Sequence, residues 1–158
     1  MTRLKESIFI NAPVDKVDDL VRDPHRWTAF FVGAGEPEKV TGDGGPGTVV
    51  EGSGTLFWGI HVHDTTKVIE ERHEADGTHW CWEVTGPVGW RLTCHHEPQE
   101  GGTLVSSESD YALPWSVLGQ AADRLFFERA QRRDMHRTLE NLKRLLEEPE
   151  TLGGRTAS

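Results

Sequence analysis

Hydrophobic positions recur at helical spacing through residues 115–148, near the end of the chain. Pro114 precedes this stretch and Pro149 follows it, and Gly119 is the one glycine inside it. Because good helix formers fill the stretch, the pattern predicts a single helix much longer than the average of about 11–12 residues.

The apolar positions of this expected helix form two stripes. The first consists of Leu118, Ala121, Ala122, Leu125 and Phe126, and the second of Met135, Leu139, Leu142 and Leu146. Both follow the i, i+3, i+4 spacing. At roughly 100° per residue, the second stripe is rotated by about a quarter turn from the first. We therefore expect the second half to pack on the core and the first half to form a lid over another surface.

The earlier part of the chain alternates between apolar and polar positions and is divided by glycines and prolines. Strands are expected at residues 4–10, 38–41, 78–85, 90–97 and 103–113, with two more between residues 48 and 74. Pro13 begins a short helix, Pro24 interrupts it, and a second short helix carries Trp27, Phe30 and Phe31. This order of elements indicates an antiparallel meander whose apolar face is covered by the long helix.

The segment Gly86-Pro87-Val88-Gly89 predicts the register of the strands beside it. Pro87 suits the second position of a type I turn, and Gly89 suits the left-handed residue that follows. Such a three-residue loop gives the pairs Gly86–Trp90, Val84–Leu92 and Trp82–Cys94. One sheet face then carries Trp80, Trp82, Val84, Trp90, Leu92 and Cys94. Cys81 lies on the opposite face from Cys94, so we expect two unpaired thiols.

Three tryptophans on one sheet face are compatible with an aromatic-rich core or with the wall of a cavity. Tryptophan combines a large apolar face with one N–H donor, which suits a pocket for flat or apolar ligands. The small residues Gly119, Ala121 and Ala122 favour a cavity, because they leave volume unfilled on the facing helix. We predict a ligand site lined by Trp80, Trp82, Trp90, Leu92, Tyr111, Leu118, Ala122 and Phe126.

Composition narrows the function classes. A length of 158 residues suits one domain, which we place at residues 1–148, with a disordered tail at 149–158. The formal net charge of −9 argues against nucleic acid and anionic membrane surfaces as partners. The sequence has two cysteines, no signal-type start and no apolar run of membrane-spanning length. We expect a cytoplasmic protein without stable membrane insertion.

Motifs that would carry chemistry are sparse. The glycine-rich loop 42–47 leads into a strand and lacks a Gly-Lys-Ser/Thr ending, so we interpret it as a structural turn. His61 and His63 share one strand face, but a zinc site needs three or four converging ligands, and we predict neither a metal nor a cofactor. Arg129 and His136 fit a solvated helix face with ion pairs better than a ligand contact. No residue is assigned a catalytic role.

Several stretches carry a family resemblance. They read SIFINAP at 7–13, GDGGPGT at 42–48, GGT at 101–103, YALP at 111–114, ADRL at 122–125, RRD at 132–134 and TLENLK at 138–143. Together they resemble the helix-grip superfamily of START domains and birch-pollen-allergen-like proteins, and its bacterial polyketide cyclase/dehydratase-like branch. The resemblance implies an α+β fold: a seven-stranded antiparallel sheet curled around a long C-terminal helix, two short helices between strands 1 and 2, and a hydrophobic cavity.

Two functions of different classes follow from the resemblance and the expected cavity. The first is the binding or carrying of a hydrophobic small molecule, such as a lipid, a quinone or an aromatic polyketide-like compound. The second is a polyketide aromatase/cyclase or dehydratase, in which positioning supplies most of the rate and one or two polar groups move protons. A protein-interaction module would instead have a filled cavity and an exposed apolar patch. The sequence assigns neither the ligand nor the oligomeric state.

Overall fold

The computed structural model describes residues 2–56, 59–111 and 121–148. The elements in chain order are β1 (Thr2–Ile10), α1 (Val14–Arg22), the 3-10 helix η1 (Pro24–Ala29), β2 (Ala34–Thr41), β3 (Val49–Leu56), β4 (Ile60–Glu74), β5 (Gly77–Thr85), β6 (Trp90–Gln99), β7 (Gly102–Tyr111) and α3 (Ala121–Glu147). The expected tail at 149–158 and the expected start of the long helix at 115–120, with Leu118, lie outside the described residues.

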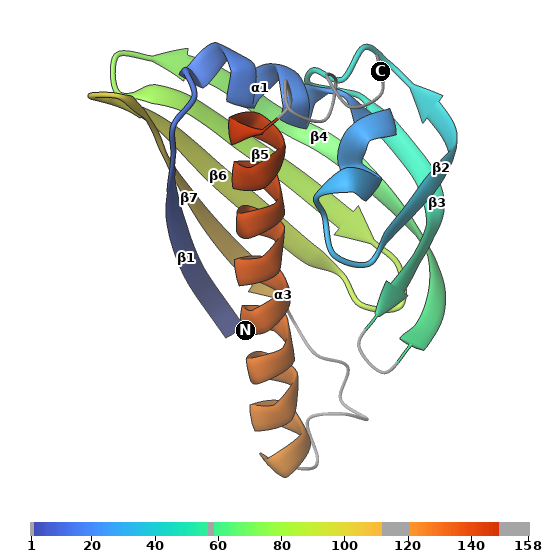
Figure 1. Ribbon diagram of the computed structural model, residues 1–158. Helices are drawn as coiled ribbons and strands as arrows, with labels where there is room; N and C mark the ends of the chain where they lie inside the picture. Colours follow the sequence, from blue (N-terminus) through green and yellow to red (C-terminus); the bar gives the residue numbers. More distant parts are fainter. Residues whose placement is uncertain (1, 57–58, 112–120, 149–158) are drawn as a thin grey trace, which may run out of the picture.

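One antiparallel sheet forms the body of the molecule. Its seven strands lie in the order β1-β7-β6-β5-β4-β3-β2. The sheet curls, α3 crosses its concave face, and α1 lies across the end of the sheet beside the C-terminal end of α3 (Figure 1). This is the predicted helix-grip arrangement. Gly77 and Gly101 adopt positive φ values of 124° and 83° at the turns into β5 and β7, where other residues would be strained.

The short helices form as their sequence predicts. Val17, Leu20 and Val21 give α1 a buried stripe at helical spacing. Pro24 begins η1, and the Asp23 side chain caps it by accepting a hydrogen bond from the His25 backbone N–H at 3.1 Å. The two helices together close one end of the curled sheet (Figure 1).

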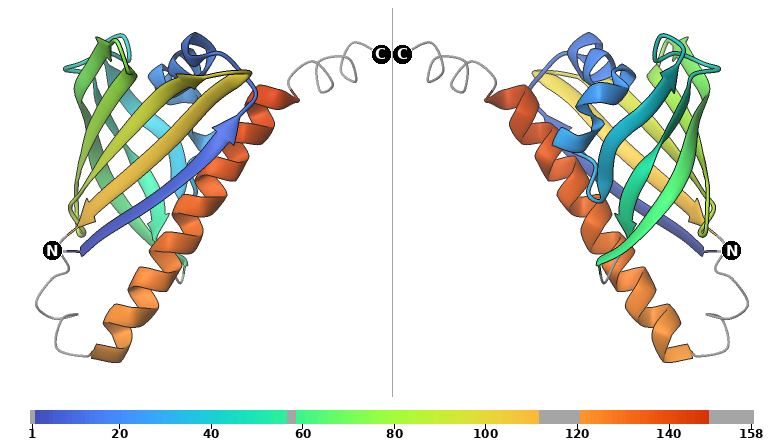
Figure 2. Two further views of the ribbon diagram at one scale, coloured as in Figure 1. Left: turned by 90° about the vertical axis from the view of Figure 1, so that its left-hand side faces the viewer. Right: turned by 90° about the vertical axis from the view of Figure 1, so that its right-hand side faces the viewer.

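The long helix has one buried stripe over its described part, where we predicted two. Phe127, Ala130 and Leu139 are buried, whereas Leu125 and Phe126 are 58% and 51% exposed. The expected first stripe at Leu125 and Phe126 is therefore wrong. The N-terminal end of α3 projects beyond the strands, so this end does not cover the sheet (Figure 2). Among the described helices, none is both long enough and apolar enough to cross a bilayer.

Strands β5 and β6 pair two residues away from the predicted register. The observed pairs include Val84–Trp90, Trp82–Leu92 and Trp80–Cys94. Residues 85–89 form the loop between Val84 and Trp90, and Gly89 lacks the positive φ that the predicted three-residue loop requires. Because a shift of two keeps every side chain on its face, the tryptophans still share one face. Cys81 and Cys94 are free thiols, as predicted.

Candidate functional site

Two neighbouring cavities, called here the two lobes of the candidate site, lie between α3, the segment after η1 (residues 30–33) and the concave face of the sheet. The first lobe, of about 100 Å³, lies between α3 and the strands β6 and β7. The second, of about 140 Å³, lies between β2 and the strands β3 to β6. Both lobes are lined by Phe31, Val32, Thr55, Trp90 and Leu92. A closed apolar cavity of about 150 Å³ holds benzene, so each lobe suits roughly one ring.

The cavity exists because the apolar core is divided into two clusters. The larger cluster joins α1, the C-terminal half of α3 and the sheet, and the smaller one consists of Leu4, Tyr111 and Phe127. Trp90 and Met135 pack against both clusters. They bridge the clusters without filling the space between them, which leaves the first lobe open beside them.

The structure places four of the predicted site residues in the cavity wall. Trp82 lines the second lobe, Tyr111 lines the first, and Trp90 and Leu92 line both. The side chain of Ala122, like Leu118, lies outside the described part of the chain.

Trp80 and Phe126, which we also predicted as ligand-binding, do not line either lobe. Trp80 is buried in the core, where its ring stacks on Trp82 at 5.3 Å between centroids and 2° between planes. It fixes the position of Trp82 and so supports the cavity wall. The helix contributes Phe127 to the first lobe in place of Phe126.

Most of the lining residues were not predicted, and three of them bear on the chemistry of the cavity: Phe127, Ser109 and Asp64. Phe127 lies one residue from the expected position on the helix. Ser109 lies two residues before Tyr111 on β7, so the two-residue period of a strand would have placed it on the same face. Asp64 lies on β4 and faces the second lobe beside Trp82 and Val84. The sequence indicated only that Asp64 lies on the opposite strand face from His63.

Each lobe is lined by a residue with a buried polar atom that lacks a hydrogen-bond partner among the described residues. These atoms are Ser109 Oγ in the first lobe and Trp82 Nε1 in the second. A buried polar group left unpaired costs about 1–3 kcal/mol, so most such groups in folded proteins have a partner. Both atoms belong to residues of the cavity wall.

Asp64 is the ionisable residue of the second lobe, and the pKa of its side chain is shifted. Burial raises the pKa of its carboxyl, and the nearby charge of His63 offsets part of that effect. A carboxyl with a raised pKa in a mainly apolar pocket is suited to acid–base chemistry.

The basic face of α3 lies away from the cavity. Arg129 is exposed, Arg132 reaches Glu6 at 3.5 Å, and His136 pairs with Glu140 at 3.1 Å. These contacts agree with the predicted solvated face.

Comparisons with known proteins give a family and a fold. Residues 1–147 match the model of the family described as polyketide cyclase/dehydrase and lipid transport. No curated protein sequence matches the chain. The ZhuI aromatase/cyclase from Streptomyces sp. R1128 is similar in structure, with a TM-score of 0.74 and 15% identity over 93% of this chain and 94% of that one. For Ara h 8.0201 the TM-score is 0.65, with 14% identity over 92% and 97%.

A third similar structure is the di-domain ARO/CYC protein BexL from the BE-7585A biosynthetic pathway. Its TM-score is 0.72, with 19% identity over 92% of this chain and 50% of BexL. This chain thus spans about half the length of BexL. At such identities the likeness establishes the fold that these proteins share.

Proposed function

This chain belongs to the polyketide cyclase/dehydrase and lipid transport family, and we propose that it binds a hydrophobic small molecule in the two-lobed cavity. The observation that carries the proposal is the unpaired polar atom in each lobe, Ser109 Oγ and Trp82 Nε1. A bound molecule with an oxygen near each end would give both atoms a partner and remove the cost of leaving them unpaired.

The sizes of the lobes favour a flat ligand of two or three rings, such as a quinone or an aromatic polyketide-like compound. Two adjoining spaces of about 100 Å³ and 140 Å³ suit fused rings better than an extended acyl chain. The aromatic rings of Trp82, Trp90 and Phe127 offer flat apolar surfaces to such rings.

Titration of the intrinsic tryptophan fluorescence with 1,4-naphthoquinone and with palmitate tests this proposal. We expect the quinone to bind with a Kd below about 100 μM, and Ser109→Ala to weaken its binding by about tenfold, which corresponds to the loss of one hydrogen bond. Ser106→Ala is the matched control, since Ser106 lies on the outer face of the same strand. Equal affinity of the two variants, or no quinone binding, would overturn the proposal.

Asp64 favours a second function, the closure and dehydration of a polyketide ring. Its carboxylate would remove a proton from the carbon next to a ketone, the enolate would add to the carbon of a second ketone, and the acid form would return the proton to the new alkoxide. Removal of the second α proton by the carboxylate and its transfer to that hydroxyl would then expel water and leave a double bond. We expect Asp64→Asn to lower turnover of a poly-β-ketone substrate at least 100-fold while the affinity for a ring ligand stays within about threefold. Unchanged turnover would exclude this role for Asp64 and leave the binding function in place.

We also propose a cytoplasmic location and a small-molecule partner in place of a nucleic acid. The two unpaired thiols and the net charge of −9 support these assignments.

A further inference from the structure

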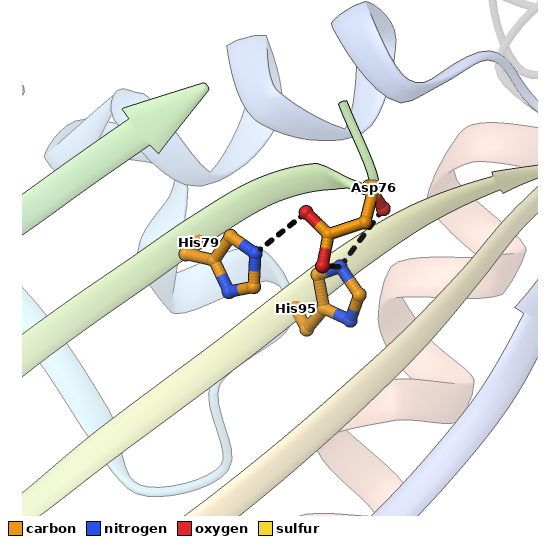
Figure 3. Close-up of side chains that lie close together, drawn as sticks. All are labelled: Asp76, His79 and His95. Atoms are coloured by element: carbon orange, nitrogen blue, oxygen red, sulfur yellow. Dashed lines mark hydrogen bonds and ion pairs between the residues drawn. The ribbon is translucent and has the colours of Figure 1, made fainter. Parts of the chain in front are cut away.

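Three side chains that commonly bind metal ions meet on the outer face of the sheet. Asp76 lies in the turn between β4 and β5, His79 on β5 and His95 on β6. His79 and His95 are directly opposite each other in the strand pairing. Their rings stack at 4.3 Å between centroids and 10° between planes, and both point toward the Asp76 carboxylate (Figure 3). This cluster is separate from the cavity, which lies on the concave face.

The spacing of the ligand atoms suits a metal ion. His79 Nε2 lies 3.0 Å from Asp76 Oδ1, and His95 Nε2 lies 3.5 Å from Asp76 Oδ2. One ligand atom from each residue falls within a group in which all distances are below 4.8 Å. Zinc bonds of about 2.0–2.2 Å in a tetrahedron place neighbouring ligand atoms about 3.3 Å apart. The two observed distances, which run to different oxygens of Asp76, lie on either side of that value, and the stacked rings must turn for both Nε2 lone pairs to face one ion.

Glu74 lies beside this group of three, next to His79, and is the nearest further carboxylate among the described residues. Its Oε2 lies 3.5 Å from His79 Nε2, while its other oxygen pairs with Arg72 at 2.5 Å. Two carboxylates and two imidazoles form a nitrogen and oxygen set that suits zinc. Magnesium prefers six oxygen ligands in an octahedron and fits this set poorly.

The two histidines are also held in place before any ion binds. Their side chains are 24% and 28% exposed, and the hydrogen-bonded pairing of β5 with β6 fixes their backbones. Ordering these rings around an ion therefore costs less conformational entropy than ordering free side chains would. The site still opens to solvent, because both histidines also line a groove of about 600 Å³.

We propose that Asp76, His79 and His95, with Glu74 as the fourth ligand, bind one zinc ion at the end of the β4–β5 hairpin. The ion takes the place of the contacts that the two Nε2 atoms make with Asp76 and connects the turn to β5 and β6. Since the ligands come together only in the folded chain, zinc stabilises the fold, by an amount that grows with the logarithm of its concentration above the Kd.

Isothermal titration of the full chain with zinc chloride tests this proposal. We expect one zinc ion per chain with a Kd below about 10 μM, no heat with magnesium chloride, and a melting temperature that rises by several degrees with zinc. The double variant His79→Asn/His95→Asn should bind zinc at least 100-fold more weakly. The control His25→Asn, at an exposed histidine outside the cluster, should keep the affinity of the parent chain.

Two results would overturn the site: no zinc binding by the parent chain at 100 μM, or equal affinity in the double variant. Melting of each variant without zinc checks that it is folded. Should the double variant fail to fold, the ring resonances of the parent chain decide the question by NMR. Zinc must then shift the His79 and His95 rings, and shifts confined to other histidines would refute the proposal. The cavity plays no part in these measurements.

Discussion

Asp18 lies on the buried side of α1 and accepts hydrogen bonds from three side chains. Thr78 Oγ1 donates at 2.7 Å, Trp80 Nε1 at 3.1 Å and His96 Nδ1 at 2.7 Å. Burial alone raises the pKa of the Asp18 carboxyl, but the hydrogen bonds from His96, Trp80 and Thr78 outweigh it and hold the pKa below its usual value of 3.8. The ionised carboxylate therefore fastens α1 to β5 and β6.

The pKa of Asp18 determines how stability depends on pH. Because folding lowers this pKa, the carboxylate stabilises the fold above about pH 4, and this stabilisation is lost as the pH falls through the folded value. We expect Asp18→Asn to reduce the free energy of unfolding by about 3 kcal/mol at pH 7, and by less at pH 2.5. Urea unfolding at both pH values measures this. Asp15→Asn, on the exposed side of α1, is the control, and a loss independent of pH would contradict the assignment.

Both cysteines are poor nucleophiles in the folded chain. Burial raises the pKa of the Cys94 thiol to about 12, although the hydroxyl of Ser107 at 3.1 Å opposes the rise, and burial also raises the pKa of Cys81. Since the thiolate is the reactive form, we expect both to react with Ellman's reagent at pH 8 far more slowly than in urea. Rapid labelling of the folded chain would show that one of the thiols is accessible and ionised.

The β5–β6 hairpin shows what periodicity predicts and what it leaves open. Alternation assigned each side chain to the correct face, because a strand has a period of two. The register depended on the turn, and the loop at 85–89 is longer than the Pro87 and Gly89 signals indicated. In the predicted register His79 would face Glu97, whereas it faces His95. The same shift of two residues thus concealed the histidine pair of the proposed zinc site.

The long helix shows a related limit. Phe126 and Phe127 are adjacent, and each fits an apolar stripe whose phase differs slightly from that of the other. The helical period alone therefore did not decide which of the two is buried. The sheet selects Phe127, which packs with Leu4 and Tyr111. The distance between its ring and that of Tyr111 is 4.8 Å.

Matched alanine variants of these two residues test the orientation of α3. Phe127→Ala should cost about 3–5 kcal/mol, since it removes a ring that is 1% exposed from a packed cluster. Phe126→Ala should cost about 1 kcal/mol or less, because its ring is 51% exposed. Thermal and urea unfolding give both values. A larger loss at Phe126 than at Phe127 would restore the orientation that the sequence predicted.

At the scale of the molecule, the cavity depends on distances that no local pattern contains. The sequence placed Trp82 and Trp90 on one face, and the resemblance implied an opening between sheet and helix. Its division into two lobes arises from the packing of α3 against one part of the core and of the segment after η1 against another. The sequence did not identify Asp64 and Ser109 as lining residues. A polar residue on a strand indicates a cavity only when the space beside it is known.

The mouth of the cavity gives the last prediction. Thr55 is exposed and Val32 is 40% exposed, yet both line both lobes, so solvent reaches the cavity between them. Thr55→Trp should slow the association of 1,4-naphthoquinone at least tenfold, because the indole fills the junction that a ligand of two rings must cross. Stopped-flow fluorescence measures the rate. Stability should change little, since position 55 is at the surface.

Lys67→Trp, at an exposed position outside both lobes, controls for the added tryptophan. Equal association rates in the two variants would mean that ligands enter elsewhere, or that one lobe alone holds them.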